Sequence, residues 1–110
     1  MYNDLNEQQQ FAVKELVQSI LEDVVYLVYT KVDGTTRGGN ATLNTDVIVE
    51  AIGKPQEGKP DAKPRKENPH VIRYFDVDKG EFRTFKLENL VTIGEFGMIH
   101  IVQQVKETVV

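Results

Sequence analysis

The chain has 110 residues, 40% of them hydrophobic, no cysteine and a net charge of −4. This length is typical of one domain with one hydrophobic core, so we expect a single domain over residues 1–110. The lack of cysteine excludes disulfides and thiolate metal sites and fits a reducing cytoplasm. No segment has the roughly 20 consecutive apolar residues that span a bilayer, and we expect neither a membrane partner nor a secretion signal.

The negative charge is concentrated in the first 24 residues, which carry one lysine and five acidic residues. The rest of the chain is nearly balanced. Proteins that coat nucleic acid usually have a strongly basic face, because their affinity comes from neutralising phosphates. The composition therefore argues against a general nucleic-acid coating protein and leaves room only for a local basic patch.

Residues 5–21 have the periodicity of an amphipathic helix. Apolar residues recur at steps of three and four from Val13 to Leu21, opposite a row of Gln, Lys and Glu. Asp4 and Glu7 have the spacing of a capping box at the start of such a helix. We expect the apolar side to pack on the sheet formed by the rest of the chain, or on another chain.

Residues 24–31 are mostly β-branched and aromatic, which predicts a strand with both faces largely covered. Asp33-Gly34 then indicates a tight hairpin, because both residues tolerate positive φ. The return strand, residues 35–43, contains Gly38-Gly39, which predicts a bulge or a sharp bend. Residues 44–46 indicate a turn or cap, and residues 47–52 form a short apolar element of undecided type.

Residues 53–69 contain all four prolines of the chain, and five basic residues there stand against three acidic ones. Such a composition cannot bury enough apolar surface to repay its ordering, so we expect an exposed, flexible loop. It would contact an acidic partner or nucleic acid, or serve only as a solvated linker. The candidate contact residues in this loop are Lys59, Lys63, Arg65 and Lys66.

The remaining segments predict more strands. Residues 71–77 and 81–87 form a second hairpin around Asp78-Lys79-Gly80, residues 90–93 form a short strand, and the apolar run 96–105 predicts an extra C-terminal strand. One helix followed by five or six short strands indicates a mainly β fold. We expect an antiparallel barrel over residues 24–93, since closure removes exposed sheet edges.

The sequence gives little support for catalysis, a cofactor or a metal site. His70 and His100 are the two histidines, and they lie on separate predicted strands without a cluster of other ligands. Asp76 and Asp78 lie close together around a turn, where aspartate usually bonds to local backbone N–H groups. We therefore expect a protein that is not an enzyme, with no cofactor and no bound metal.

Basic and aromatic residues alternate on two adjacent predicted strands, as expected of a surface that binds single-stranded nucleic acid by stacking and by phosphate contacts. Strand alternation places Arg83 with Phe85 on one face and Phe82 with Lys86 on the other. This separation favours the alternative that one aromatic set belongs to the core. The candidate ligand-binding residues are Arg73, Tyr74, Arg83, Phe85 and Lys86.

Two blocks of the sequence carry a family resemblance: residues 28–37, around Asp33-Gly34, and residues 76–90, with an Asp-rich turn and an Arg-Thr-Phe strand. They resemble the first and the closing hairpin of the WYL-like domains. The Lys/Pro-rich loop, left through Asn68-Pro69, resembles a branch of short proteins from tailed bacteriophages. The family's Trp-Tyr-Leu triplet falls on residues 70–72, which are His-Val-Ile here, and a later arginine falls on Asn89.

This resemblance implies an Sm-like, SH3-type barrel in a phage-encoded protein that acts in the infected bacterial cytoplasm. It also implies a regulatory binding module for single-stranded nucleic acid or a nucleotide ligand, with Arg83 and Phe85 at the family's Arg-Thr-Phe positions. The alternative is a protein-binding module that modifies a host process, which the acidic N-terminal segment favours. A homo-oligomer that uses the last strand as an edge is compatible with either function.

Overall fold

The computed structural model describes residues 2–53 and 68–108. The expected contacts at Lys59, Lys63, Arg65 and Lys66 lie outside these residues. None of the described helices is long and apolar enough to cross a membrane. The elements in chain order are η1 (Tyr2–Asp4), α1 (Glu7–Ile20), β1 (Val25–Thr30), β2 (Thr36–Thr42), α2 (Thr45–Ile52), β3 (Val71–Asp76), β4 (Glu81–Lys86), η2 (Leu87–Asn89), β5 (Leu90–Ile93), β6 (Phe96–Gly97) and α3 (Met98–Thr108).

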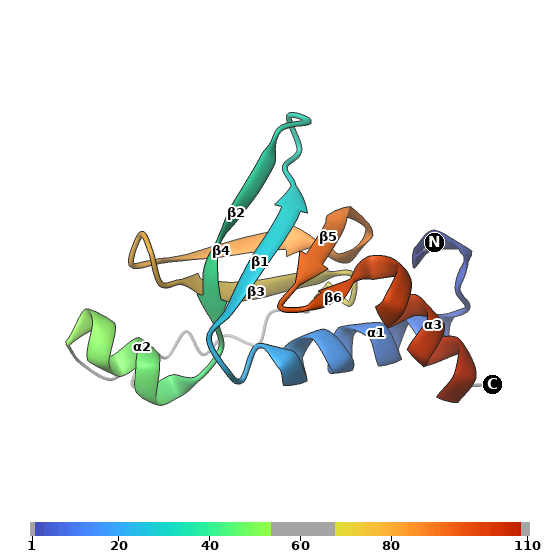
Figure 1. The fold of residues 1–110 in the computed structure, drawn as a ribbon, viewed down its shortest axis with the longest axis horizontal. Helices are drawn as coiled ribbons and strands as arrows, with labels where there is room; N and C mark the ends of the chain where they lie inside the picture. Colours follow the sequence, from blue (N-terminus) through green and yellow to red (C-terminus); the bar gives the residue numbers. More distant parts are fainter. Residues whose placement is uncertain (1, 54–67, 109–110) are drawn as a thin grey trace.

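The strands form one antiparallel sheet in the order β4-β3-β2-β1-β5-β6. β1 and β2 run across β3 and β4 at a steep angle (Figure 1). The sheet curls strongly. In the sheet order two strands separate β1 from β4, yet the ring of Tyr29 in β1 stacks on that of Phe85 in β4, with centroids 4.9 Å apart. The predicted mainly β, barrel-like architecture is confirmed.

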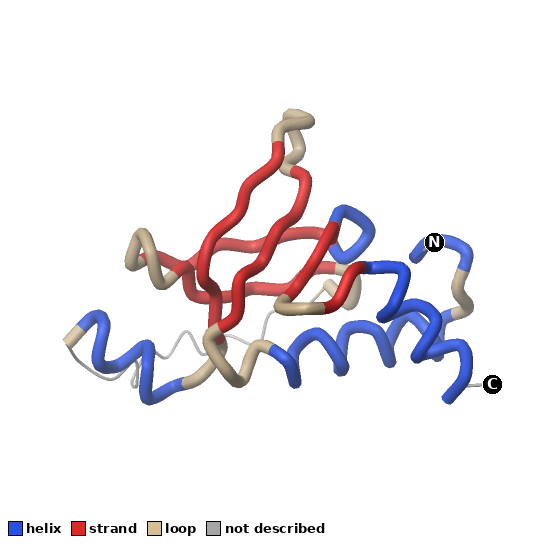
Figure 2. The backbone as a smooth tube through the Cα atoms, in the orientation of Figure 1, coloured by secondary structure: helices blue, strands red, loops and turns tan. Residues whose placement is uncertain are grey.

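Helices α1 and α3 lie side by side beneath the sheet (Figures 1 and 2). Val13, Val17 and Leu21 from the first helical segment are fully buried in the same core cluster as Ile101 and Val105 of α3. The amphipathic period of residues 5–21 is therefore confirmed, and the apolar side of this helix packs on the chain's own sheet.

The cap at the start of α1 lies two residues later than predicted. Asn6 is the N-cap: its Oδ1 accepts from the Gln9 N–H at 2.8 Å, and the Gln9 side chain accepts from the Asn6 N–H at 3.2 Å. The expected Asp4–Glu7 box is wrong, because residues 2–4 form the short turn η1. Asn6 and Gln9 form the same reciprocal bonds as the Ser–Glu pair of a common capping box, because each amide side chain has an oxygen that accepts from the other residue's backbone N–H.

The predicted C-terminal strand over residues 96–105 is also wrong. Only Phe96–Gly97 pairs as a strand, and the chain then forms the helix α3. Met98, Ile101, Val102 and Val105 are buried, a spacing of three and four that fits a helix. The β-branched residues of this run were compatible with a strand, and packing against α1 decides for the helix.

The undecided segment 47–52 belongs to the helix α2. The Asn44 side chain caps it by accepting from the N–H groups of Asp46 and Val47, which confirms the predicted cap, and Gly53 ends it at a φ of 80°. The two predicted hairpin turns are confirmed as well, with Gly34 at a φ of 93° and Gly80 at 69°. Both angles are in the left-handed region that favours glycine.

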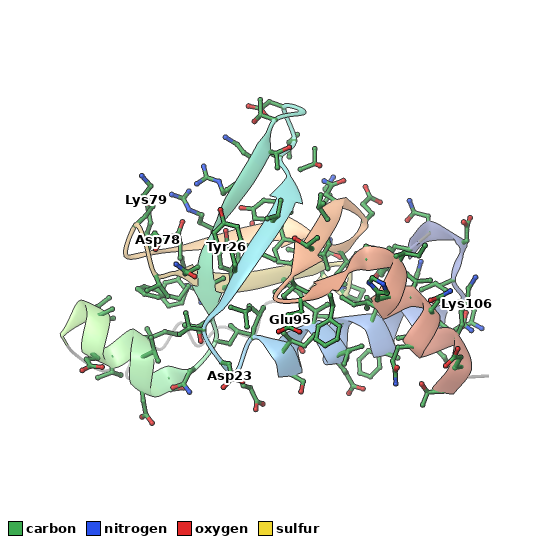
Figure 3. All side chains as sticks on the ribbon, viewed as in Figure 1. Asp23, Tyr26, Asp78, Lys79, Glu95 and Lys106 are labelled. Atoms are coloured by element: carbon green, nitrogen blue, oxygen red, sulfur yellow. The ribbon has the colours of Figure 1, made fainter. Side chains whose placement is uncertain are left out.

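The predicted bulge at Gly38-Gly39 is absent from the first hairpin. β1 and β2 pair in continuous register from Val25 opposite Ala41 to Thr30 opposite Thr36. Gly38 instead lies beneath the ring of Tyr26 (labelled in Figure 3), where an added Cβ would come within 2.8 Å of the Tyr26 hydroxyl. Tyr26 is half-exposed, so the outer face of β1 is less covered than predicted.

Asp76 and Asp78 have structural roles around the second turn, as expected. Asp76 is buried and accepts from the Lys79 N–H at 3.0 Å. The Asp78 carboxylate accepts from the backbone and side-chain N–H groups of Asn40, at 2.9 and 3.2 Å. These bonds lower the pKa of Asp78 and attach the β3–β4 turn to β2.

Candidate ligand-binding cleft

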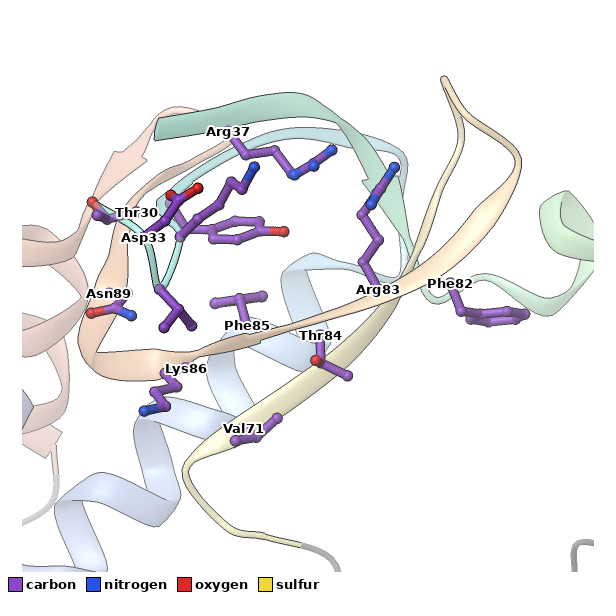
Figure 4. Close-up of a pocket in the computed structure, with 13 residues that line it drawn as sticks. Thr30, Asp33, Arg37, Val71, Phe82, Arg83, Thr84, Phe85, Lys86 and Asn89 are labelled. Atoms are coloured by element: carbon purple, nitrogen blue, oxygen red, sulfur yellow. The ribbon is translucent and has the colours of Figure 1, made fainter. Parts of the chain in front are cut away.

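A cleft of about 570 Å³ separates the first hairpin from β4 (Figure 4). One wall comes from the end of β1, the turn and the start of β2, and the other comes mainly from β4. Residues from two hairpins that are far apart in the sequence therefore share this site. The lining residues are Tyr29, Thr30, Lys31, Val32, Asp33, Arg37, Val71, Phe82, Arg83, Thr84, Phe85, Lys86 and Asn89.

The base of the cleft is formed by aromatic side chains of the core. Tyr29 lies parallel to Phe85, and its hydroxyl forms a hydrogen bond of 2.9 Å with that of Tyr74. Tyr74 and Phe85 are only 3% and 4% exposed, and Tyr74 does not line the cleft. Because Phe85 stacks on Tyr29, it gives the cleft an apolar wall and not a free ring face on which a base could stack.

Burial and the hydrogen bond with Tyr29 raise the pKa of Tyr74 far above its ordinary value. The nearby Asp76 acts in the same direction, and Arg83 acts against it. Tyr74 therefore stays neutral over the physiological range, and its hydroxyl fixes the distance between β1 and β3 at the base of the cleft.

Arg83 is held in place by two carboxylates. Its Nε donates to Asp76 Oδ2 at 2.7 Å, and its Nη2 donates to Glu81 Oε2 at 3.0 Å. The bond to Asp76 is the largest of the effects that raise the pKa of Arg83. A guanidinium has five N–H donors, so these two bonds orient the group and leave donors for a ligand.

Three further cationic side chains line the cleft: Lys31, Arg37 and Lys86. Arg37 is opposite Tyr29 in the β1–β2 register, as Arg83 is opposite Tyr74 in β3–β4. Paired residues project from the same face, so both arginines lie beside the hydrogen-bonded tyrosines. Arg37 and Arg83 extend from opposite walls toward one mouth of the cleft (Figure 4).

Asp33 is the one acidic residue among the described residues that line the cleft. Its Oδ1 accepts from the Thr35 N–H at 3.0 Å and from the Thr35 hydroxyl at 2.7 Å. These bonds are the main reason that the pKa of Asp33 is lowered, with a smaller contribution from Lys31. Asp33 thus stabilises the hairpin turn, and the four cations give the cleft a positive balance.

The backbone of β4 is open toward the cleft. The Leu87 N–H donates to the His70 C=O at 2.9 Å, so Leu87 faces β3. In an antiparallel pair every second residue faces the partner strand, so the N–H and C=O groups of residues 83 and 85 also point toward β3. Those of Phe82, Thr84 and Lys86 point away from it. Within the described part of the chain, β4 is the end strand of the sheet, so these groups are available to a ligand.

Arg73 does not share the cleft. It lies on the other face of β3, with its guanidinium carbon 4.0 Å from the centre of the Phe82 ring, and Phe82 also contacts Phe75 edge to face. The alternation deduced from the sequence is therefore correct. Of the five expected strand residues, the structure gathers Arg83, Phe85 and Lys86 in the cleft.

Comparison with known proteins supports the curled sheet. Residues 13–91 match the model of WYL_2, described as an Sm-like SH3 β-barrel fold. The chain belongs to the WYL_2 family. It is also 30% identical over 100 residues, 90% of this chain and 94% of the relative, to the "Uncharacterized 11.5 kDa protein in Gp31-cd intergenic region" of Enterobacteria phage T4. No solved structure matches.

These matches confirm the resemblance and the phage association that the sequence predicted. At the position of the later WYL-like arginine, Asn89 lines the cleft of this WYL_2 barrel without a charge. Arg37 and Lys31 supply positive charge from the facing wall, and sequence reasoning missed both. The hairpin register would have identified Arg37, because pairing the residues on the two sides of the Asp33-Gly34 turn places Arg37 opposite Tyr29.

The two histidines of this WYL_2 protein lie outside the strands on which they were expected. His70 precedes β3 and shares a hydrogen bond of 2.7 Å with the Tyr2 hydroxyl through Nδ1. His100 is in α3, where its Nδ1 accepts from the Gly97 N–H at 3.2 Å. Among residues 2–53 and 68–108, no group of three or more potential metal ligands comes together.

Proposed function

We propose that this WYL_2 protein is a non-enzymatic, regulatory binding module that holds a single-stranded nucleic acid or a nucleotide in the cleft between the first hairpin and β4. The observation that carries the proposal is the charge of the cleft: within residues 2–53 and 68–108, four cations and one acidic residue line it, in a chain whose net charge is −4. Such local concentration of charge is expected where an anionic ligand binds.

Phosphate groups would enter between Arg37 and Arg83, which extend from opposite walls toward one mouth of the cleft. Arg83 is already oriented by Asp76, so little side-chain entropy is lost when it binds. Arginine suits this role because its planar group donates two parallel bonds to a phosphate. Lys31 and Lys86 add charge near the same path.

The bases would lie along β4. The outward N–H and C=O groups of Phe82, Thr84 and Lys86 match the donors and acceptors on base edges, and Phe85 supplies an apolar wall. In a duplex these base edges are largely occupied by pairing, so an open strand edge favours unpaired nucleotides. The phage relative and the cysteine-free composition support the cytoplasm of an infected bacterium as the place of action.

Fluorescence anisotropy with labelled single-stranded RNA and DNA, at low and moderate salt, tests this function, with calorimetry for mononucleotides. The double variant Lys31→Glu/Arg37→Glu is expected to weaken binding at least about tenfold. The matched control is Lys79→Glu/Lys106→Glu, which makes the same change in net charge at two exposed lysines outside the cleft (labelled in Figure 3). This control is expected to bind almost as the parent does.

Two outcomes count against the proposal. One is the absence of binding at about 100 μM protein and low salt, where even non-specific complexes with nucleic acid form. The other is an equal loss of affinity in the cleft variant and in the control, since that result assigns the binding to overall charge and not to the cleft.

A further inference from the structure

A second concave surface lies on the helical side of the molecule and shares no residue with the cleft. It is a groove of about 610 Å³ between α1, the β5–β6 turn and α3. Because its walls are two packed helices, the shape of the groove is set by the core beneath it. The lining residues are Leu16, Ile20, Glu95, Phe96, His100, Ile101, Gln103, Gln104 and Glu107.

The floor of this groove is apolar and partly open to solvent. Leu16 and Ile20 of α1 are partly buried against the core, and Ile101 of α3, which also lines the groove, belongs to that core. Phe96 is 49% exposed at the tip of the two-residue strand β6. A half-exposed aromatic ring next to aliphatic side chains is the usual anchor of a protein–protein contact.

The charge around the groove is acidic. Glu95 lies beside β6 (labelled in Figure 3), and Glu107 lies near the end of α3, about 14 Å along the helix axis from its first residue, Met98, at 1.5 Å per residue. The described residues that line the groove include no lysine or arginine. The segment 1–24, which contains the groove residues Leu16 and Ile20, has a net charge of −4.

We propose that this groove docks a basic amphipathic helix of a protein partner. The apolar side of that helix would cover Leu16, Ile20 and Phe96, and lysine or arginine side chains at its two ends would face Glu95 and Glu107. Helices bind grooves of this kind through apolar residues at steps of three and four, and the rise of about 14 Å along α3 from Met98 to Glu107 corresponds to two to three turns of such a helix. An acidic segment would be repelled by Glu95 and Glu107.

The test uses the full chain and a labelled helical model peptide of about 14 residues, with leucine on one side and lysine on the other. The same peptide with glutamate in place of lysine is the charge control. The lysine peptide is expected to bind saturably, the glutamate peptide is not, and Phe96→Ala is expected to weaken binding at least about tenfold. Ile99→Ala, at an exposed residue of α3 outside the groove, is the matched apolar control.

Charge reversal separates local complementarity from net charge. Glu95→Lys/Glu107→Lys is expected to abolish most of the binding, whereas Glu50→Lys/Glu88→Lys, with the same change in net charge at exposed residues elsewhere, is expected to preserve it. Circular dichroism and thermal melting confirm that each variant is folded. The proposal is overturned if no saturable binding of the lysine peptide is seen, if both peptides bind alike, or if the groove variants match their controls.

Discussion

The hydroxyl oxygens of Tyr29 and Tyr74 lie 2.9 Å apart inside the barrel, and each tyrosine has an arginine as its cross-strand neighbour. The pair joins β1 to β3 across the interior of the curled sheet. Their cross-strand partners, Arg37 and Arg83, are thereby brought to the two walls of the cleft. The position of the cationic site thus depends on a polar contact in the core.

Removing both hydroxyls of this pair should cost less than the sum of the two single removals. Tyr29→Phe and Tyr74→Phe each leave one buried hydroxyl without its partner, so each is expected to lower the free energy of unfolding by about 1–2 kcal/mol. The double variant is expected to lose less than the sum, because no unpaired hydroxyl remains. Urea unfolding of the four proteins measures this cycle, and strict additivity would show that the bond contributes nothing.

The same burial predicts a loss of stability in alkali. The pKa of Tyr74 is raised on folding, so above about pH 10 the unfolded chain releases the phenolic proton while the folded chain keeps it, and the free energy of unfolding falls as the pH rises. Burial raises the pKa of Tyr2 in the same direction. Unfolding curves between about pH 8 and 11 should show this fall, and Tyr74→Phe should make it shallower. An unchanged slope in that variant contradicts the assignment.

Asp76 should matter far more to stability than Glu81, although both bind Arg83. The Asp76 side chain is 6% exposed and that of Glu81 is 59% exposed. Asp76→Ala removes the partner of Arg83 and of the Lys79 N–H, with an expected cost of about 2–4 kcal/mol. Glu81→Ala breaks an exposed pair and is expected to cost less than about 1 kcal/mol. Thermal unfolding of the two variants compares them directly.

Glycine replacement should separate steric from conformational constraint in the first hairpin. Gly38→Ala brings a methyl group against the Tyr26 hydroxyl, and the half-exposed ring can shift, so the expected cost is below about 1 kcal/mol and disappears in a Tyr26→Ala background. Gly34→Ala meets no neighbouring atom within 4 Å but keeps a φ of 93°, so its cost should be the same in both backgrounds. The distinction is refuted if Tyr26→Ala changes the unfolding cost of Gly38→Ala and that of Gly34→Ala by the same amount.

The proposed ligand site also predicts a salt dependence. If phosphates contact Lys31 and Arg37, the logarithm of affinity should fall linearly with the logarithm of salt concentration. Each cation lost should reduce that slope by about 1. Titrations of Lys31→Gln and Arg37→Gln at several salt concentrations measure this effect. Slopes equal to that of the parent would place the phosphates elsewhere.

Local sequence patterns were enough to predict the turns and the buried side of the first helix. Asp33-Gly34 and Asp78-Lys79-Gly80 specify their turns because few residues adopt positive φ, and the apolar period of Val13, Val17 and Leu21 specifies the buried side of α1. The family resemblance, carried by the two hairpins, added the Sm-like SH3 barrel.

Long-range packing settled the features that a local pattern leaves open. Residues 98–105 satisfy both a strand and a helix pattern, and packing against α1 selects the helix. Asp4–Glu7 and Asn6–Gln9 both have the spacing of a capping box, and the tertiary structure selects Asn6–Gln9 because residues 2–4 form η1. The cleft joins Arg37 to Arg83 only after the sheet curls and Tyr29 meets Tyr74, and such long-range pairing depends on register and curvature that no short window of sequence contains.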